Sequence, residues 1–151
     1  MRPSIFHNYS EDKNIDVNAR HKYGKTAFML ACYKGQIDVV KLLLDHSEDK
    51  NIDLNATTYS LGRTAFMIAC GEGHKAVVKL LLDYSKDKNI DLNAKTNYGG
   101  TVFHLAFKHK GVGQLLLDHH SVHTPLVQCS GPNYVEFQDE EEEQFEFRNK
   151  I

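Results

Sequence analysis

The sequence of 151 residues predicts an all-α solenoid, in which about three helix-turn-helix units stack in a row with hairpin loops between them. Three short motifs occur once in every unit and in a constant order. NIDVNA or NIDLNA begins at residues 14, 51 and 89, GxTxF at 24, 62 and 99, and LLLD at 42, 80 and 115. The first two motifs recur every 37 or 38 residues, and a fixed period of this length indicates a stacked repeat.

The first helix of each unit is expected directly after the hairpin glycine, at 27–33 in the first unit. Gly24 allows the positive φ of a tight turn, and the hydroxyl of Thr26 can cap free N–H groups at the helix start. The segment that follows, AFMLACY, is apolar on nearly every side. Such a helix must be buried between neighbouring units.

The second helix is expected at 37–47, after a break at Gly35. One of its faces is apolar and the opposite face is charged, which is typical of a helix that covers a core. The apolar face consists of Ile37, Val40, Leu43 and Leu44, and the charged face of Asp38, Lys41 and Asp45. The next residues, HSEDK and YSKDK in the first two units, are compatible with one more helical turn. The NIDLNA corner follows, where Asn tolerates a left-handed conformation.

These motifs resemble the ankyrin repeat family. The similarity rests on the GxTAF helix starts, LAC and IAC, the glycines that end the first helices, VVKLLL and DLNA, and it covers about residues 8–120. The units are longer than the 33 residues usual in that family, and TAFM replaces its TPLH motif. The resemblance implies a scaffold that binds another protein. It also marks Asn55 and Asn93 as candidates for the asparagine hydroxylation known in the family.

The chain divides into a repeat domain at 1–120 and a tail at 121–151. The repeat domain comprises a partial unit at 1–23 and units at about 24–61, 62–98 and 99–120. The third unit is short and carries Gly111 and Gly113 in its second helix, as expected for the end of an array. Residues 7–19 match the end of a unit at 83–94. Either Ile5 and Phe6 form a cap, or the chain is an excerpt of a longer array.

The tail differs from the repeat domain in charge. Residues 1–120 contain 16 Lys and Arg against 13 Asp and Glu, a net charge of +3, and residues 121–151 contain 2 against 7, a net charge of −5. Gly131 and Pro132 precede YVEF, DEEEE and FEF. We expect an irregular, disordered acidic tail. The alternative is that this acidic and aromatic segment docks on a basic groove of the same chain.

No arrangement of residues predicts catalysis, because the sequence contains no GxSxG, Walker or HExxH motif. We therefore expect no enzyme activity, no small-molecule substrate and no cofactor. His119, His120, His123 and Cys129 could ligate zinc, but their spacing matches no structural zinc pattern, so no metal is expected. Cys32 and Cys70 occupy equivalent positions in two units, where small buried side chains are expected and a functional pair is the alternative.

The expected binding surface is the concave side, where hairpin tips and first-helix ends align. Tyr together with Arg and Lys is the composition of interaction hot spots. The alternative is that the tyrosines near the tips only pack against neighbouring hairpins. The candidate residues are Arg20, Lys22, Tyr23, Tyr33, Lys34, Tyr59, Leu61, Glu72, Lys95, Tyr98, Lys108 and His109.

The sequence therefore predicts a non-enzymatic scaffold that binds a partner protein on this side. One alternative is a regulatory module whose tail covers its own groove, and another is a protein that binds metal or nucleic acid. A net charge of +3 over residues 1–120 disfavours nucleic acid. With three cysteines and no apolar stretch long enough for a membrane span, we expect an intracellular protein. Its predicted location is the cytoplasm, with the nucleus as an alternative, and it acts as a monomer or as part of a longer array.

Overall fold

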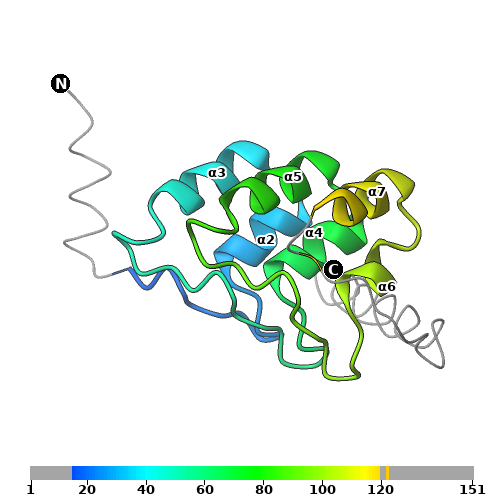
Figure 1. Ribbon diagram of the computed structural model, residues 1–151. Helices are drawn as coiled ribbons and strands as arrows, with labels where there is room; N and C mark the ends of the chain where they lie inside the picture. Colours follow the sequence, from blue (N-terminus) through cyan, green and yellow to red (C-terminus); the bar gives the residue numbers. More distant parts are fainter. Residues whose placement is uncertain (1–14, 120–121, 123–151) are drawn as a thin grey trace.

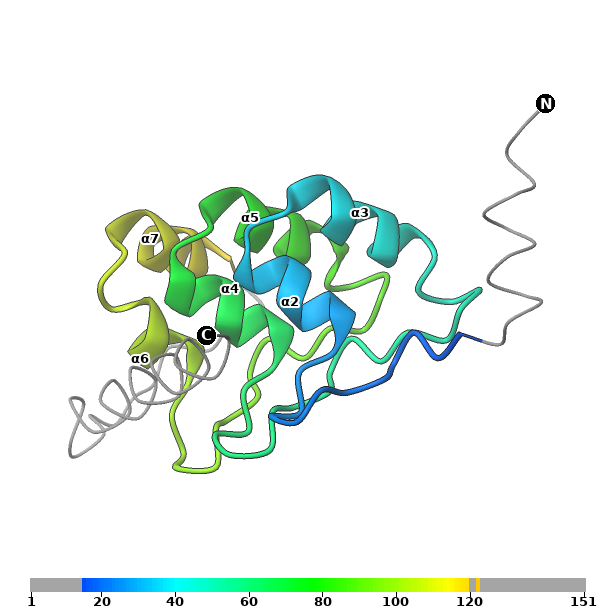
Figure 2. The same ribbon diagram turned by 180° about the vertical axis from the view of Figure 1, so that it is seen from behind.

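The computed structural model describes residues 15–119 and 122, and within this part the chain is a stack of three helix pairs (Figure 1 and Figure 2). The first helices lie in one row and the second helices in another. Neighbours within each row pack against each other. The inner row is α2 (Ala27–Tyr33), α4 (Ala65–Glu72) and α6 (Val102–Ala106), and the outer row is α3 (Ile37–Asp45), α5 (Lys75–Tyr84) and α7 (Lys110–Asp118). No strand occurs among the described residues, so the predicted helical solenoid is confirmed.

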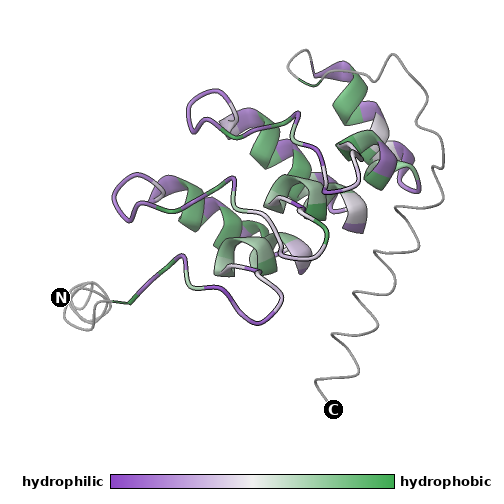
Figure 3. Cartoon of the chain, turned by 90° about the horizontal axis from the view of Figure 1, so that it is seen from below, coloured by the Kyte–Doolittle hydropathy of each residue, from purple (hydrophilic) through white to green (hydrophobic). Residues whose placement is uncertain are grey.

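The inner helices begin and pack as their sequences predict. The hydroxyl oxygens of Thr26 and Thr64 accept hydrogen bonds of 3.3 Å from the N–H groups of Met29 and Met67. In α4, six consecutive residues from Ala65 to Cys70 are all buried. A helix without a polar side is stable here because α2 and α6 cover its opposite sides. Figure 3 shows the hydrophobic residues concentrated on the helices and the hydrophilic ones on the loops between them.

The outer helices are amphipathic, with one correction to the predicted apolar face. Val40 and Leu44 are completely buried in α3, as expected. Ile37, in contrast, is 39% exposed. Ile37 is the first residue of its helix, and Lys75 and Lys110 occupy this position in the later units. Because charged residues are accommodated there, the position lies at the edge of the core.

The first outer helix exposes apolar side chains that later units bury. Val39 is 44% exposed, whereas its equivalents Val77 and Val112 are each 1% exposed. Leu42 of α3 is 58% exposed, and its equivalents Leu80 and Leu115 are half-buried. The difference arises because no described helix precedes α3 in the outer row. Ile5 and Phe6, which form a cap in one of the two alternatives given above, lie outside the described residues.

The outer helix is shorter than predicted and continues as a turn. α3 ends at Asp45 rather than at residue 47. Residues 46–51 form a hydrogen-bonded turn that closes with the bond from the N–H of Ile52 to the carbonyl oxygen of Ser47, 2.8 Å long. Asn51 has a φ of 51° and Asn89 in the next unit a φ of 54°. The left-handed Asn therefore ends the turn, in the manner of a helix C-cap.

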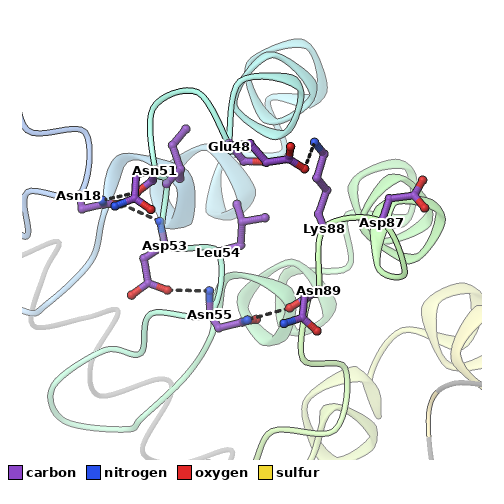
Figure 4. A pocket seen from close by; sticks show the side chains of 11 residues that line it. Asn18, Glu48, Asn51, Asp53, Leu54, Asn55, Asp87, Lys88 and Asn89 are labelled. Atoms are coloured by element: carbon purple, nitrogen blue, oxygen red, sulfur yellow. Dashed lines mark hydrogen bonds and ion pairs between the residues drawn. The ribbon is translucent and has the colours of Figure 1, made fainter.

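The second Asn of the first two NIDxNA corners joins one unit to the next (Figure 4). The Nδ2 group of Asn55 donates to the carbonyl oxygen of Asn89 at 2.9 Å, and its Oδ1 accepts from the N–H of Asp91 at 2.8 Å. One unit earlier, Asn18 makes the same pair of bonds, each 2.8 Å long. The first and second copies of the motif therefore each bind the backbone of the following copy.

Histidine side chains join the units at the opposite end of the inner helices. The Nε2 atom of His74 lies 2.8 Å from the carbonyl oxygen of Tyr33, and that of His109 lies 3.0 Å from the carbonyl oxygen of Gly71. A carbonyl oxygen can only accept, so each ring donates from Nε2. The ring of His74 also lies against Gly35, where an added Cβ would come within 2.7 Å of it.

We predict that replacing Asn55 with Ala lowers the free energy of unfolding by about 1–2 kcal/mol, because two hydrogen bonds between units are lost. Asn55→Asp should cost at least as much, since its second carboxylate oxygen would face the carbonyl oxygen of Asn89. Urea unfolding followed by circular dichroism measures both effects. Lys86→Ala, an exposed change in the adjacent loop, is the control. If the chain with Asn55→Asp were as stable as the natural chain, the role given to this side chain would be contradicted.

Candidate functional site

The three hairpins are joined to one another by backbone hydrogen bonds. The N–H of Tyr59 donates to the carbonyl oxygen of Tyr23 at 3.2 Å, and the N–H of Asn97 donates to the carbonyl oxygen of Leu61 at 2.9 Å. Each hairpin is therefore held against the preceding one. The tips lie side by side along one edge of the stack (Figure 1 and Figure 2).

The tyrosines near the hairpin tips do not occupy equivalent positions. Tyr23 and Tyr98 each directly precede the hairpin glycine of their unit, and Leu61 takes this place in the second unit. Leu61 is buried, so it cannot offer its side chain to a partner, and its assignment as a contact residue is wrong. The ring of Tyr59 lies over Gly24 of the preceding hairpin, where an added Cβ would come within 2.8 Å of the ring. Tyr59 nevertheless stays 60% exposed.

A basic and aromatic cluster surrounds Tyr33 at the end of α2. The Nζ atoms of Lys25 and Lys34 lie 4.8 and 5.1 Å from the centre of the Tyr33 ring. These are cation–π distances, and they orient both ammonium groups. Lys25 is only 5% exposed, and sequence analysis did not select it. The sequence signal that could have identified Lys25 is its position one residue before the capping Thr26. From there its side chain reaches the ring of Tyr33, the last residue of α2.

Two further cation–π contacts lie on the hairpins. The guanidinium of Arg20 lies 5.6 Å from the centre of the Tyr59 ring, and the Nη1 group of Arg20 donates to the carbonyl oxygen of Thr57 at 3.0 Å. The Nζ atom of Lys22 lies 4.9 Å from the centre of the Tyr23 ring. Arg20 therefore links the hairpins of two successive units.

The remaining candidate residues vary in exposure. His109 donates to the backbone of the preceding unit, as described above, so it has a structural role. Exposed candidates are Arg20, Lys22, Lys34, Tyr59, Lys95, Tyr98 and Lys108, and half-buried ones are Tyr23, Tyr33, Glu72 and His109. The structure brings together Arg20 with Tyr59, Lys22 with Tyr23, and Lys34 with Tyr33.

Charge is segregated between the two sides of the stack, a property that the net charge conceals. We define the inner surface as the hairpins and inner helices, residues 19–36, 56–74 and 94–109. These segments contain seven Lys and Arg residues, of which Lys25 and Arg63 are buried, against one acidic residue, a net charge of +6. The other described residues carry seven against ten, a net charge of −3. The basic residues of the inner surface are Arg20, Lys22, Lys25, Lys34, Arg63, Lys95 and Lys108, and the acidic one is Glu72.

A pocket of about 550 Å³ lies elsewhere, at the NIDLNA corners (Figure 4). No candidate contact residue lines it. The amide groups of Asn18 and Asn55 are bonded to backbone atoms there, and the ion pair of Lys88 with Glu48, 3.1 Å long, spans the two units. The pocket therefore results from the junction between units. The hydroxylation expected at Asn55 and Asn93 stays a prediction.

Among residues 15–119 and 122, no three His, Cys, Asp or Glu side chains are grouped so that they could hold a metal ion. His120, His123 and Cys129 lie outside the described residues.

The two described cysteines, Cys32 and Cys70, are free thiols in the core. Burial raises the pKa of Cys32 to about 12 and raises the pKa of Cys70 further, because it disfavours the thiolate. Neutral buried thiols are inert.

We predict that iodoacetamide at about pH 8 leaves Cys32 and Cys70 unmodified in the folded chain and modifies both in guanidinium chloride. The contribution of the two thiols to the free energy of unfolding should be constant below their ordinary pKa of 9.0 and fall as the pH rises toward 12, because the unfolded chain then loses protons that the native chain retains. Peptide mass mapping and urea unfolding at several pH values measure these effects. Rapid alkylation of either cysteine in the native chain would contradict their burial.

None of the described helices is both long and apolar enough to cross a membrane. Comparison with curated protein sequences finds no match. A family model described as "Ankyrin repeats (3 copies)" matches residues 4–57 and again residues 50–128. These matches include all six described helices and most of the chain. The chain therefore belongs to the ankyrin repeat family.

Proposed function

We propose that this chain is a non-enzymatic scaffold that binds a partner protein on its inner surface. Ankyrin repeats are generally modules of protein–protein interaction, and the family is typically non-enzymatic. One observation carries the choice of surface. Exposed aromatic and basic side chains, among them Tyr59, Tyr98 and Lys34, stand on hairpins that backbone hydrogen bonds join and on inner helices that pack in a row.

The mechanism is presentation of a preformed surface. The stack fixes the hairpins before a partner arrives, so little conformational entropy is lost from this side on binding. A standard interface buries about 800 Å² on each partner, and we propose that the partner spans all three hairpins. Tyrosine supplies large contact areas with few rotatable bonds, which suits such a surface.

We predict that the double substitution Tyr59→Ala and Tyr98→Ala abolishes capture of the partner, because the two residues are 60% and 49% exposed. The measurement is crosslinked pull-down from the native cell, quantified by mass spectrometry, with capture falling about tenfold or more. The matched control is Lys41→Ala with Lys79→Ala, at equivalent exposed positions of α3 and α5. Equal capture by both double variants would refute the choice of surface, provided that circular dichroism shows both to be folded.

A second candidate function is a regulatory module whose acidic tail covers the inner surface. The complementary charges favour it, because the inner surface carries a net charge of +6 and residues 121–151 carry −5. The tail lies outside the described residues apart from Val122.

We predict for this second candidate that removing residues 131–151 increases partner capture several-fold. A control chain keeps the length of the tail but carries Asp139→Asn and Glu140–143→Gln. This chain should show the same increase in capture if charge holds the tail in place. The readout is the same quantitative pull-down. Capture that is unchanged by both alterations would eliminate the regulatory function.

A further inference from the structure

We infer that the inner surface takes an acidic segment of polypeptide, and that the first unit provides its main contacts. This inference rests on the proposed function, because it names the chemistry of the partner for the same surface. It follows from the distribution of charge along the stack and from the way in which aromatic rings hold the basic side chains.

The positive charge of the inner surface is concentrated in its first segment. Residues 19–36 contain four Lys and Arg residues and no acidic residue. Residues 56–74 contain Arg63 and Glu72, with no net charge, and residues 94–109 contain Lys95 and Lys108. An anionic ligand is therefore attracted most strongly to the hairpin and inner helix of the first unit.

The basic groups of the first unit are held in place before binding. Tyr33 contacts both Lys25 and Lys34, Lys22 lies over Tyr23, and the guanidinium of Arg20 is fixed by the carbonyl oxygen of Thr57. Three of these cations, on Arg20, Lys22 and Lys34, belong to exposed residues. Ordered cations lose little rotamer entropy when a carboxylate binds, and charged hydrogen bonds to carboxylates are the stronger kind.

An acidic peptide fits these observations better than a nucleic acid. The four Lys and Arg residues of residues 19–36 are fewer than the six to ten phosphate contacts typical of tight DNA binding. The isoelectric point of the chain is also about 6.5 rather than above 9. The other described residues carry a net charge of −3 and would repel a long polyanion. A short acidic segment contacts only the inner surface and avoids this repulsion.

The test measures binding of a fluorescent oligoglutamate peptide by anisotropy. The protein is the full chain with Asp139→Asn and Glu140–143→Gln, so that its own tail does not compete. Lys22→Glu with Lys34→Glu should weaken binding about tenfold or more. The matched control, Lys75→Glu with Lys79→Glu on the exposed side of α5, changes the charge equally and should weaken it less than about twofold. Binding should also fall as sodium chloride is raised.

Three results would overturn the inference. The first is an absence of peptide binding at low salt, and the second is an equal loss of peptide affinity in the two charge variants. The third is that a labelled oligothymidine binds more tightly than the peptide and that Lys22→Glu with Lys34→Glu abolishes this binding. The pull-down with Tyr59→Ala and Tyr98→Ala shows whether a negative result refutes only this inference or also the proposed function. If capture still depends on the tyrosines, only the acidic chemistry of the partner is refuted. If capture is independent of them as well, the proposed surface itself is wrong.

Discussion

Burial of each inner helix by the neighbouring units is the constraint on which the rest of the structure depends. α4 is apolar around its whole circumference and is stable only because α2 and α6 cover it. Stacking at a fixed distance then allows short side chains to reach from one unit to the next. Asn18 and Asn55 do so at the corners, and His74 and His109 at the ends of the inner helices.

The same constraint connects the fold to the proposed binding surface. Because the hairpins are bonded to each other in sequence, the side chains at their tips are displayed in a fixed order. The cation–π contacts of Tyr33 and Tyr59 add local order to the basic groups. The two buried thiols remain protonated within the core. A preformed surface with segregated charge is what a binding module requires.

Local features of the fold were predictable from the sequence because each depends on one or two residues. The Thr caps, the positive φ of Gly24 and the left-handed Asn of the corners are of this kind. Features that depend on neighbouring units were not. Ile37 matches the apolar periodicity of its helix but lies at the edge of the core, and Leu61 fills a place that Tyr23 and Tyr98 occupy in their own hairpins. Among the site residues, Lys25 was missed because its contact with Tyr33 exists only after the helix forms.

Native-state hydrogen exchange at the hairpins tests most directly whether the stack holds the binding surface in place. The amide of Tyr59 donates to Tyr23, and that of Asn97 donates to Leu61, so both should exchange as slowly as the amides within α4. The amide of Ser60, next to Tyr59 at an exposed tip, provides the internal comparison. Exchange of Tyr59 and Asn97 at the rate of free loop amides would mean that the hairpins move independently of the stack, and it would contradict a preformed binding surface.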